Sequence, residues 1–282
     1  MALVELYPDL LRALNGPGPV WPRLSPTTVG FLAGLEATYG PETFGPAGVP
    51  GALDRLAAPL LRAIAPAVGY GLAESARALL HTVTPLLPGR PADLYLGTLL
   101  FIAPAGTVNV GGQPAIAVGL ERFHSAPPQG GEKIWYHPSE IAEMIPHEAA
   151  HAARMQVLGL PPTLRVLSLL DMVMLEGTAL TFTDLLLGRE TLATFMPADR
   201  LAWHRAHDDA VRTHVAAEFA NVGMEPFRRY FAAASPVSGY YVGYSLCRQY
   251  LDRYGPAAVR ELVALPSREI LRRLYQAPAG LA

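Results

Sequence analysis

Cysteine and long apolar runs are nearly missing from this sequence of 282 residues. Cys247 is the only cysteine, which excludes a disulfide within the chain and slightly favours a reducing compartment. No apolar run reaches membrane-spanning length without a charge, proline or glycine. The opening residues, MALVELYPDLLRALNGPG, also lack the basic and apolar regions of a signal peptide. We therefore expect a soluble, cytoplasmic protein with no membrane partner.

An excess of charge of one sign is also absent. The net charge is −2 and the sequence pI is about 6.4, so no broad basic face is available for nucleic acid or anionic lipid. Hydrophobic residues make up 51% of the chain, which is enough to bury a sizeable core. Partners must therefore be inferred from a local site, and the oligomeric state is left open.

Most of the chain has apolar periodicity typical of helices, interrupted by proline and glycine. In the first part of the chain we expect helices at residues 2–15, 26–39, 51–64 and 70–82. In the second part we expect them at 139–158, 169–187, 197–220, 225–233, 239–254 and 256–275.

Residues 94–123, between these two groups, are rich in β-branched and large apolar residues. Gly111-Gly112 separates two such runs, which predicts a hairpin, and residues 131–138 are expected to add a strand or an extended lead-in. The sequence thus predicts a mostly helical α+β fold with a small antiparallel sheet. No linker is evident, so an N-terminal helical region, 1–90, and a domain at 91–282 could also form one continuous domain.

The most informative segment is the HExxH pattern His147-Glu148-Ala149-Ala150-His151. Residues four apart share one helix face, so both imidazoles can point at one metal ion while Glu148 reaches a water molecule beside it. Nitrogen donors suit zinc, which in catalytic sites takes three protein ligands and keeps one position for water. The alternative is a pair of surface or capping histidines that bind no metal.

Helix lengths indicate where a third ligand comes from. The motif helix continues for seven residues after His151 before Gly159, and Ser168 has the capping form that begins the next helix at 169. Glu176 lies seven residues into that helix, so an antiparallel return brings it level with His151. The other acidic residues of the helix would lie a turn or more away. The alternative for Glu176 is a solvated glutamate on a helix face.

Pro146 stands inside the motif helix, directly before His147. There it removes a backbone donor and crowds the carbonyl of Ala142, at a cost of roughly 3 kcal/mol. One interpretation is a bend that orients the metal-binding turns and is offset by metal coordination. The other is that two helices meet at Ile145, with Pro146 in an undemanding first-turn position.

Three motifs occur in order: HEAAH at 147–151, EGTA at 176–179 and GYYVGY at 239–244. Together they resemble the predicted zinc-dependent proteases of domain-of-unknown-function family 2268, whose patterns are HExxH, EGLA and GYxxGY. The resemblance covers roughly residues 94–265 and leaves the N-terminal helical half outside. It implies a zincin-like core of gluzincin type, in which His147, His151 and Glu176 are zinc ligands. It also implies that Glu148 is the catalytic acid and base.

The GYYVGY segment adds candidate hydrogen-bond donors. Tyr240 and Tyr244 share a helix face, and Gly239 and Gly243 leave that surface open to close packing. A neutral phenol beside the metal could stabilise the negative charge that develops on a carbonyl oxygen during amide hydrolysis. Tyr240 is the first choice and Tyr244 the second. The alternative is that both tyrosines are half-buried packing residues.

Other polar residues give weaker signals. His204 and His207 form a rival metal pair, but their charged neighbours favour a solvated helix face. Asp171 and Thr181 are candidates for orienting the imidazoles. Cys247, on an apolar helix face, is expected to be a buried hydrophobic residue rather than a nucleophile.

The function that these residues predict is zinc-dependent hydrolysis of a peptide or protein substrate. Zinc would polarise the carbonyl, Glu148 would move the proton, and Tyr240 would stabilise the oxyanion. Residues 115–123, if they form an edge strand, could pair with an extended substrate. A regulatory or binding protein with a structural or vestigial metal site is the alternative, and a hydrolase of non-peptide amides is a third reading. An acid beside the ligands favours a hydrolase, because a structural site needs no base.

Overall fold

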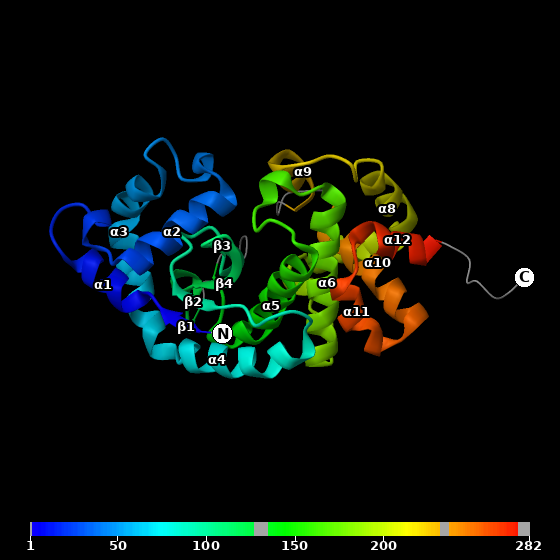
Figure 1. Cartoon of the computed structure of the whole chain (residues 1–282), viewed down its shortest axis with the longest axis horizontal. Coiled ribbons are helices and arrows are strands. Elements are labelled where there is room, and N and C mark those ends of the chain that lie inside the picture. Colours follow the sequence, from blue (N-terminus) through cyan, green and yellow to red (C-terminus); the bar gives the residue numbers. More distant parts are fainter. Residues whose placement is uncertain (1, 127–134, 232–236, 276–282) are drawn as a thin grey trace, which may run out of the picture. The chain divides into compact units, whose positions relative to one another are not determined.

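The computed structural model describes residues 2–126, 135–231 and 237–275 (Figure 1). The chain divides into two compact units. The first comprises Met1–Pro85, Arg90–Ala152 and Pro161–Thr163, and the second comprises Leu86–Gly89, Ala153–Leu160 and Leu164–Ala282. These units do not follow the expected division at residue 90, which stays a prediction. The described residues are mostly helical and include one small sheet, so the expected α+β class is confirmed.

The first unit contains the sheet and four helices of the N-terminal part. These helices are α1 (Tyr7–Asn15), α2 (Pro26–Tyr39), α3 (Gly48–Ala67) and α4 (Leu72–Val83). Helix α2 begins as the sequence predicts, because Ser25 accepts a hydrogen bond from the Thr28 N–H and Pro26 takes the first helical position. The expected helix 2–15 is shorter, since its first residues form a strand instead.

The sheet has four strands in the order β1-β2-β4-β3. They are β1 (Leu3–Glu5), β2 (Leu94–Gly97), β3 (Ala105–Val110) and β4 (Gln113–Gly119). Strand β2 is parallel to both β1 and β4, while β3 and β4 are antiparallel. The prediction of an antiparallel sheet was therefore wrong. Parallel strands need a long connection, and α1 to α4 provide it between β1 and β2.

The predicted hairpin is confirmed at Gly111-Gly112. Both residues have positive φ, 59° and 78°, which glycine adopts without steric cost, and they join β3 to β4. Strand β4 lies between β2 and β3, so the strand expected within 115–123 is not an edge strand. The edge strand next to it is β3.

Helix α2 covers the outer side of β3 near its C-terminal end. The Asn109 N–H donates to Thr38 Oγ1 at 2.9 Å. A Cβ atom at Gly34 would lie 1.9 Å from the Asn109 carbonyl oxygen, so only glycine allows this approach. The strand is thereby held between β4 and α2.

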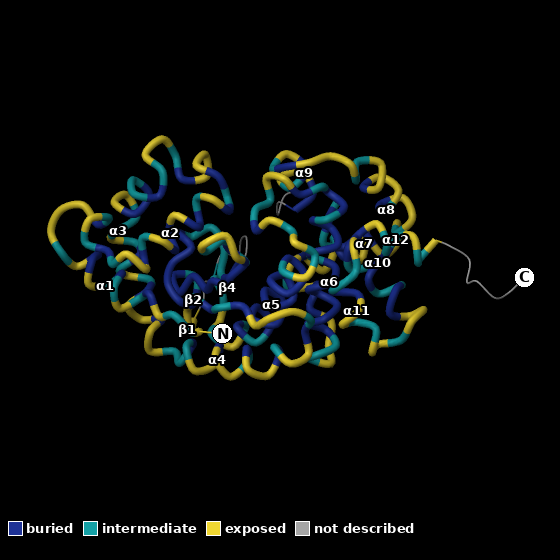
Figure 2. Tube along the Cα trace, viewed as in Figure 1, coloured by how far each residue is buried: buried dark blue, intermediate teal, exposed yellow. Residues whose placement is uncertain are grey.

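One long helix, α5 (Ile141–Leu158), begins in the first unit and ends in the second. The other helices of the second unit are α6 (Leu169–Leu187), α7 (Ala198–Ala206), α8 (Asp208–Ala216), α9 (Met224–Phe231), α10 (Gly239–Tyr254), α11 (Val259–Ala264) and α12 (Ser267–Tyr275). The expected helix 197–220 is interrupted at His207, where φ is −123° and ψ is 27°. Helix α6 is buried along most of its length (Figure 2).

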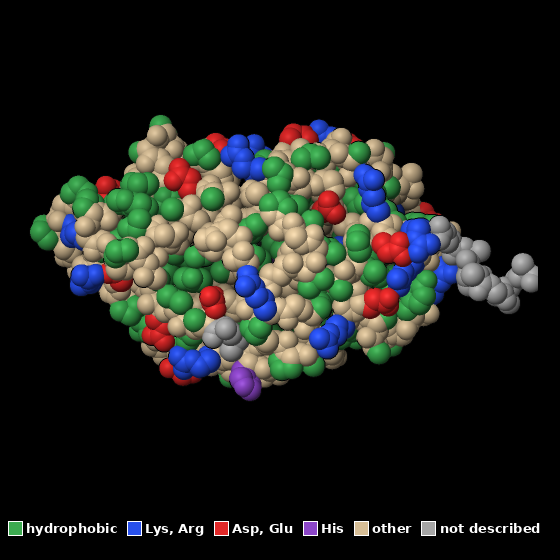
Figure 3. Space-filling view, viewed as in Figure 1, with side chains coloured by type: hydrophobic (Ala, Val, Ile, Leu, Met, Phe, Trp, Pro, Cys, Tyr) green, Lys and Arg blue, Asp and Glu red, His purple; other side chains and the backbone are tan. Residues whose placement is uncertain are grey.

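Basic and acidic side chains are interspersed on the face drawn in Figure 3, with no broad area of one charge. Among the described residues of the second unit, Arg273 forms ion pairs with Glu261 and Glu269. No single helix in the described ranges has both the length and the apolar composition needed to cross a membrane. One pair of helical segments has that length and composition only when the two are taken together: Pro41–Tyr70 and Leu72–Leu86, which are bent by 62° at their junction.

Candidate metal centre

Helix α5 supplies the HEAAH segment as part of one continuous helix. The helix begins at Ile141 and Pro146 is its sixth residue, so the interpretation with two separate helices was wrong. Because proline has no N–H, the Ala142 carbonyl lacks its usual partner within the helix. Helix α5 therefore lacks one backbone hydrogen bond in the turn directly before His147.

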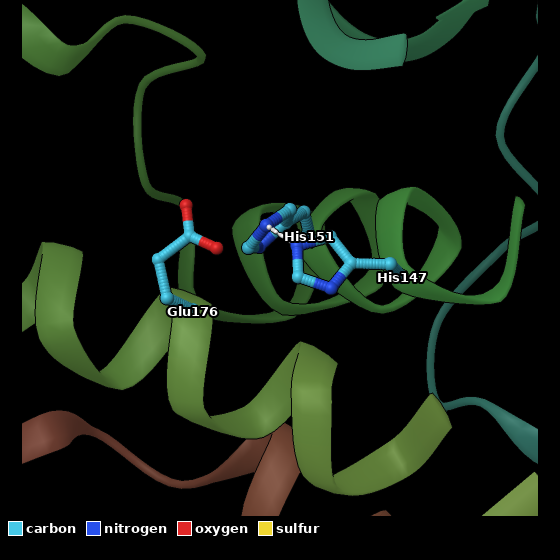
Figure 4. A group of neighbouring side chains, drawn as sticks. All are labelled: His147, His151 and Glu176. Atoms are coloured by element: carbon cyan, nitrogen blue, oxygen red, sulfur yellow. Dashed lines mark hydrogen bonds between the residues drawn. The ribbon is translucent and has the colours of Figure 1, made fainter. Parts of the chain in front are cut away.

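The two imidazoles are buried and adjacent. His147 is 4% exposed and His151 is 6% exposed, and their Nε2 atoms lie 2.9 Å apart. The rings are nearly perpendicular, with an interplanar angle of 87°. Figure 4 shows both rings reaching from α5 toward the carboxylate of Glu176 on α6. One ligand atom from each of these three residues lies within 4.8 Å of the others.

This arrangement fits a zinc ion in its donor chemistry and its spacing. Two imidazole nitrogens and one carboxylate oxygen form a ligand set that catalytic zinc uses. The 2.9 Å between the nitrogens is shorter than two Zn–N bonds of about 2.0–2.1 Å each, so one ion can contact both. In the described ranges, no other group of histidine, cysteine and acidic side chains has such spacing.

Glu176 reaches this position because of how α6 begins. Ser168 caps the helix by accepting a hydrogen bond from the Asp171 N–H at 3.1 Å, and the helix then runs without a break to Leu187. The half-buried Glu176 lies beside the imidazoles, as counting residues along the two helices predicted. Its role as a ligand stays a prediction.

Glu148 is also buried, at 9% exposure, and a strand residue holds it. Thr107 Oγ1 of β3 lies 2.9 Å from Glu148 Oε2 and 3.2 Å from the Glu148 main-chain oxygen. Thr107 lies 41 positions before Glu148 and was not among the residues predicted from the sequence. No local pattern marks it, since the contact depends on how β3 packs against α5.

Two tyrosines of GYYVGY donate to buried or half-buried acids. Tyr244 Oη donates to Asp184 Oδ2 at 2.8 Å, and Tyr241 Oη donates to Asp208 Oδ1 at 2.9 Å. Burial is the main reason that the pKa of each tyrosine is raised, and it also raises the pKa of Asp184. Tyr244 could donate to a substrate only by leaving Asp184.

Tyr240, the first-choice oxyanion donor, is half-buried in α10 and lies among aromatic rings. Its ring centroid lies 5.2 Å from that of Phe195 and 5.1 Å from that of Phe231. These contacts fix the ring by packing. Whether its hydroxyl serves catalysis stays a prediction.

The glycines of EGTA and GYYVGY have a clear structural role. A Cβ atom at Gly177 would lie 2.2 Å from the carbonyl of Gly243, and one at Gly243 would lie 2.0 Å from the Val173 oxygen. Helices α6 and α10 therefore approach until their backbones touch. The carboxylate of Glu176 is carried by the helix turn that makes this contact.

The residues that we expected to orient the imidazoles make other contacts. Thr181 Oγ1 donates to the Gly177 oxygen of its own helix. Asp171 accepts hydrogen bonds from Ser267 and pairs with Ser168. The same Ser267 accepts from Arg154, a fully buried residue whose guanidinium also donates to two carbonyls of α11. Burial lowers the pKa of Arg154 to about 10. This network anchors the end of α5.

The rival histidine pair is divided between two environments. His207 is exposed and stacks on Trp203, as expected for a solvated face. His204 is buried, contrary to that expectation: its Nδ1 lies 2.8 Å from the Arg200 oxygen, and its Nε2 accepts the Ser238 N–H at 3.1 Å. Burial lowers the pKa of His204, and the neutral ring supports the start of α10.

Comparison with known families identifies the region that carries this site. Residues 133–272 match the model of domain-of-unknown-function family 2268, described as a predicted Zn-dependent protease. The resemblance to this family is thereby confirmed. The family match contains all three motifs but begins later than the expected start near residue 94, so β3 and Thr107 lie outside it. No curated protein and no solved structure matches the chain, and the zincin-like core stays a prediction.

Proposed function

We propose that the protein is a zinc-dependent peptidase of gluzincin type, with His147, His151 and Glu176 as the zinc ligands. The observation that carries this proposal is the meeting of two imidazole nitrogens and one carboxylate oxygen within 4.8 Å. Zinc in such a site supplies Lewis acidity toward a carbonyl group and lowers the pKa of water. The family description, predicted Zn-dependent protease, supports the same reaction class.

Glu148 is the general base and acid of the proposed reaction. Its carboxylate takes a proton from the attacking water and then delivers that proton to the leaving amine. The residue adjoins His147 in a buried part of α5, and Thr107 holds one of its oxygens. A purely structural metal site would not need a carboxylate in this position.

Tyr240 is the proposed donor to the developing oxyanion. A neutral phenol carries the proton that this hydrogen bond needs, so no shifted pKa is required. Tyr244 is the second choice, because donation to a substrate would first require its hydrogen bond to Asp184 to break.

Strand β3 is the proposed pairing edge for a peptide or protein substrate. In an antiparallel pair, alternate residues direct their backbone groups away from the partner strand. The Asn109 N–H donates to Thr38 of α2, so the backbone groups of Asn109 point away from β4. Those of Thr107 and Ala105, two and four residues earlier on the same strand, point the same way. Because α2 covers Asn109, substrate pairing is limited to Ala105 and Thr107. The cytoplasmic location stays a prediction.

A single substitution tests the proposal. Glu148→Gln should retain zinc but lower the hydrolysis of casein or a peptide library by about 10²–10⁴-fold, because it removes the base but keeps the side-chain size. Glu74→Gln, the same change on an exposed face of α4, is the control and should leave hydrolysis unchanged.

Two results would contradict the assignment of Glu148: unchanged hydrolysis, or a parallel loss of zinc and hydrolysis. A wild-type protein that binds zinc, loses thermal stability with a chelator and cleaves nothing would instead support a structural metal site.

A further inference from the structure

Thr107 donates a hydrogen bond to the carboxylate of Glu148. In the described ranges, Glu148 accepts no other side-chain hydrogen bond besides that of Thr107 to Oε2, at 2.9 Å. The second carboxylate oxygen, Oε1, accepts none from these residues. One oxygen is thus held by the strand, and the other is left for the reacting proton.

The contact can persist on both sides of a proton transfer. When Glu148 is a carboxylate, the Thr107 hydroxyl must be the donor, since Oε2 can only accept. When Glu148 carries the proton on Oε1, Oε2 is a carbonyl oxygen that still accepts from the same hydroxyl. The Glu148 main-chain oxygen, 3.2 Å from Thr107 Oγ1, is a second acceptor within reach of that hydroxyl. Thr107 therefore has a hydrogen-bond partner in either state.

Thr107 lies in a strand that has neighbours on both sides. It lies in the middle of β3, opposite Ile116 of β4, and α2 holds the outer side of the same strand two residues later. A β-branched side chain also has restricted χ1 rotation. A fixed hydroxyl on a fixed strand can restrain a glutamate, whose three side-chain torsions would otherwise let the carboxylate turn away.

We propose that Thr107 is a positioning residue that aims Glu148 Oε1 at the water it deprotonates. This inference rests on the proposed peptidase function. It extends the catalytic unit beyond the matched region 133–272, because β3 belongs to the part of the chain before it. The N-terminal half thereby contributes to the chemistry as well as to the fold.

Kinetics of the full-length protein test this role. Thr107→Val removes the hydroxyl and keeps the branched shape. It should lower kcat by about 10- to 100-fold with KM and zinc content nearly unchanged. Thr107→Ser restores a hydroxyl and should recover most of kcat. In a Glu148→Gln background, Thr107→Val should cause no further loss, because its effect acts through the carboxylate. Thr82→Val, the same change on an exposed helix face, is the control.

Wild-type kcat in Thr107→Val, a serine variant as slow as the valine variant, or equal losses in both backgrounds would overturn the inference. Crystal structures of the two variants give a second readout that does not need activity. The Glu148 carboxylate should keep its direction in Thr107→Ser and rotate in Thr107→Val. If the wild type cleaves nothing, the proposed function fails, and an unrotated carboxylate in Thr107→Val would separately reject the positioning role.

Discussion

The HEAAH segment of α5 and the GYYVGY segment of α10 have the same residue spacing, but their ring side chains make different contacts. Each places two ring-bearing residues four positions apart on one helix face. In α5 the nitrogens of His147 and His151 meet each other and the Glu176 carboxylate. In α10 the Tyr240 ring packs among aromatic rings, and the Tyr244 hydroxyl donates to Asp184. Spacing alone therefore does not distinguish a ligand pair from a packing pair.

The difference follows from the residues between and beside the rings. In α10 the glycines remove side chains where α6 crosses, so the helix pair packs backbone to backbone and the tyrosines lie around that contact. In α5 Ala149 and Ala150 are small and buried, and the polar groups are the imidazoles themselves. Four experiments test this contrast, in order of decreasing effect.

The largest effect is expected for zinc binding. His151→Ala removes a proposed ligand and should weaken zinc affinity by more than the roughly 10- to 100-fold typical of losing an outer partner. Tyr240→Phe should keep full zinc content, because its hydroxyl is not a ligand in the proposed site. Metal analysis and competition with a chelator measure both. Equal zinc loss in the two variants would contradict the claim that the α5 histidine binds zinc and the α10 tyrosine does not.

A methyl group at the helix crossing should reduce stability next. Gly243→Ala places a Cβ 2.0 Å from the Val173 oxygen, which should lower the free energy of unfolding by about 2–3 kcal/mol. Gly30→Ala is the control, because it lies in α2 with no atom within 4 Å of the added Cβ. It should stabilise the helix by up to about 1 kcal/mol. Urea unfolding measures both, and similar losses would refute the close crossing.

Removing one tyrosine hydroxyl should have a moderate effect. Tyr244→Phe leaves Asp184 Oδ2 without this donor and should lower the free energy of unfolding by about 1–2 kcal/mol, with zinc content unchanged. Tyr254→Phe, at a 43% exposed position, should change stability by less than about 0.5 kcal/mol. Unchanged stability with a reduced kcat in Tyr244→Phe would instead favour its second-choice role as the oxyanion donor.

The smallest effect concerns pH and the start of α10. Burial lowers the pKa of His204 below its usual 6.5, so below about pH 6.5 the unfolded chain binds more protons than the folded protein. The stability from neutral His204 is therefore present above pH 6.5 and is lost as the pH falls. In His204→Gln, the decrease in unfolding free energy from about pH 7.5 to about pH 5.5 should be smaller. If the wild type and His204→Gln lose the same unfolding free energy over this pH range, His204 is not the source of the pH dependence.

Local signals predicted several elements to the residue. Helices at 26–39, 169–187 and 239–254 match α2, α6 and α10. Their ends depend on neighbours in sequence, such as Ser168 at the start of α6 and the left-handed Gly188 at its end. The β3–β4 hairpin is local in the same way. The first strand was missed because Leu3–Glu5 pairs with residues about 90 positions later, and nothing in the adjacent sequence records that partner.

Within the candidate site, helical periodicity predicted that His147 and His151 share one face, since an α-helix repeats every 3.6 residues. The lengths of two helices also predicted that Glu176 lies level with His151. The packing of separate elements brings Thr107 to Glu148, brings the tyrosine hydroxyls to acids, and buries His204. Each of these contacts joins residues at least 30 positions apart, so each depends on how separate elements pack, which periodicity and capping do not encode.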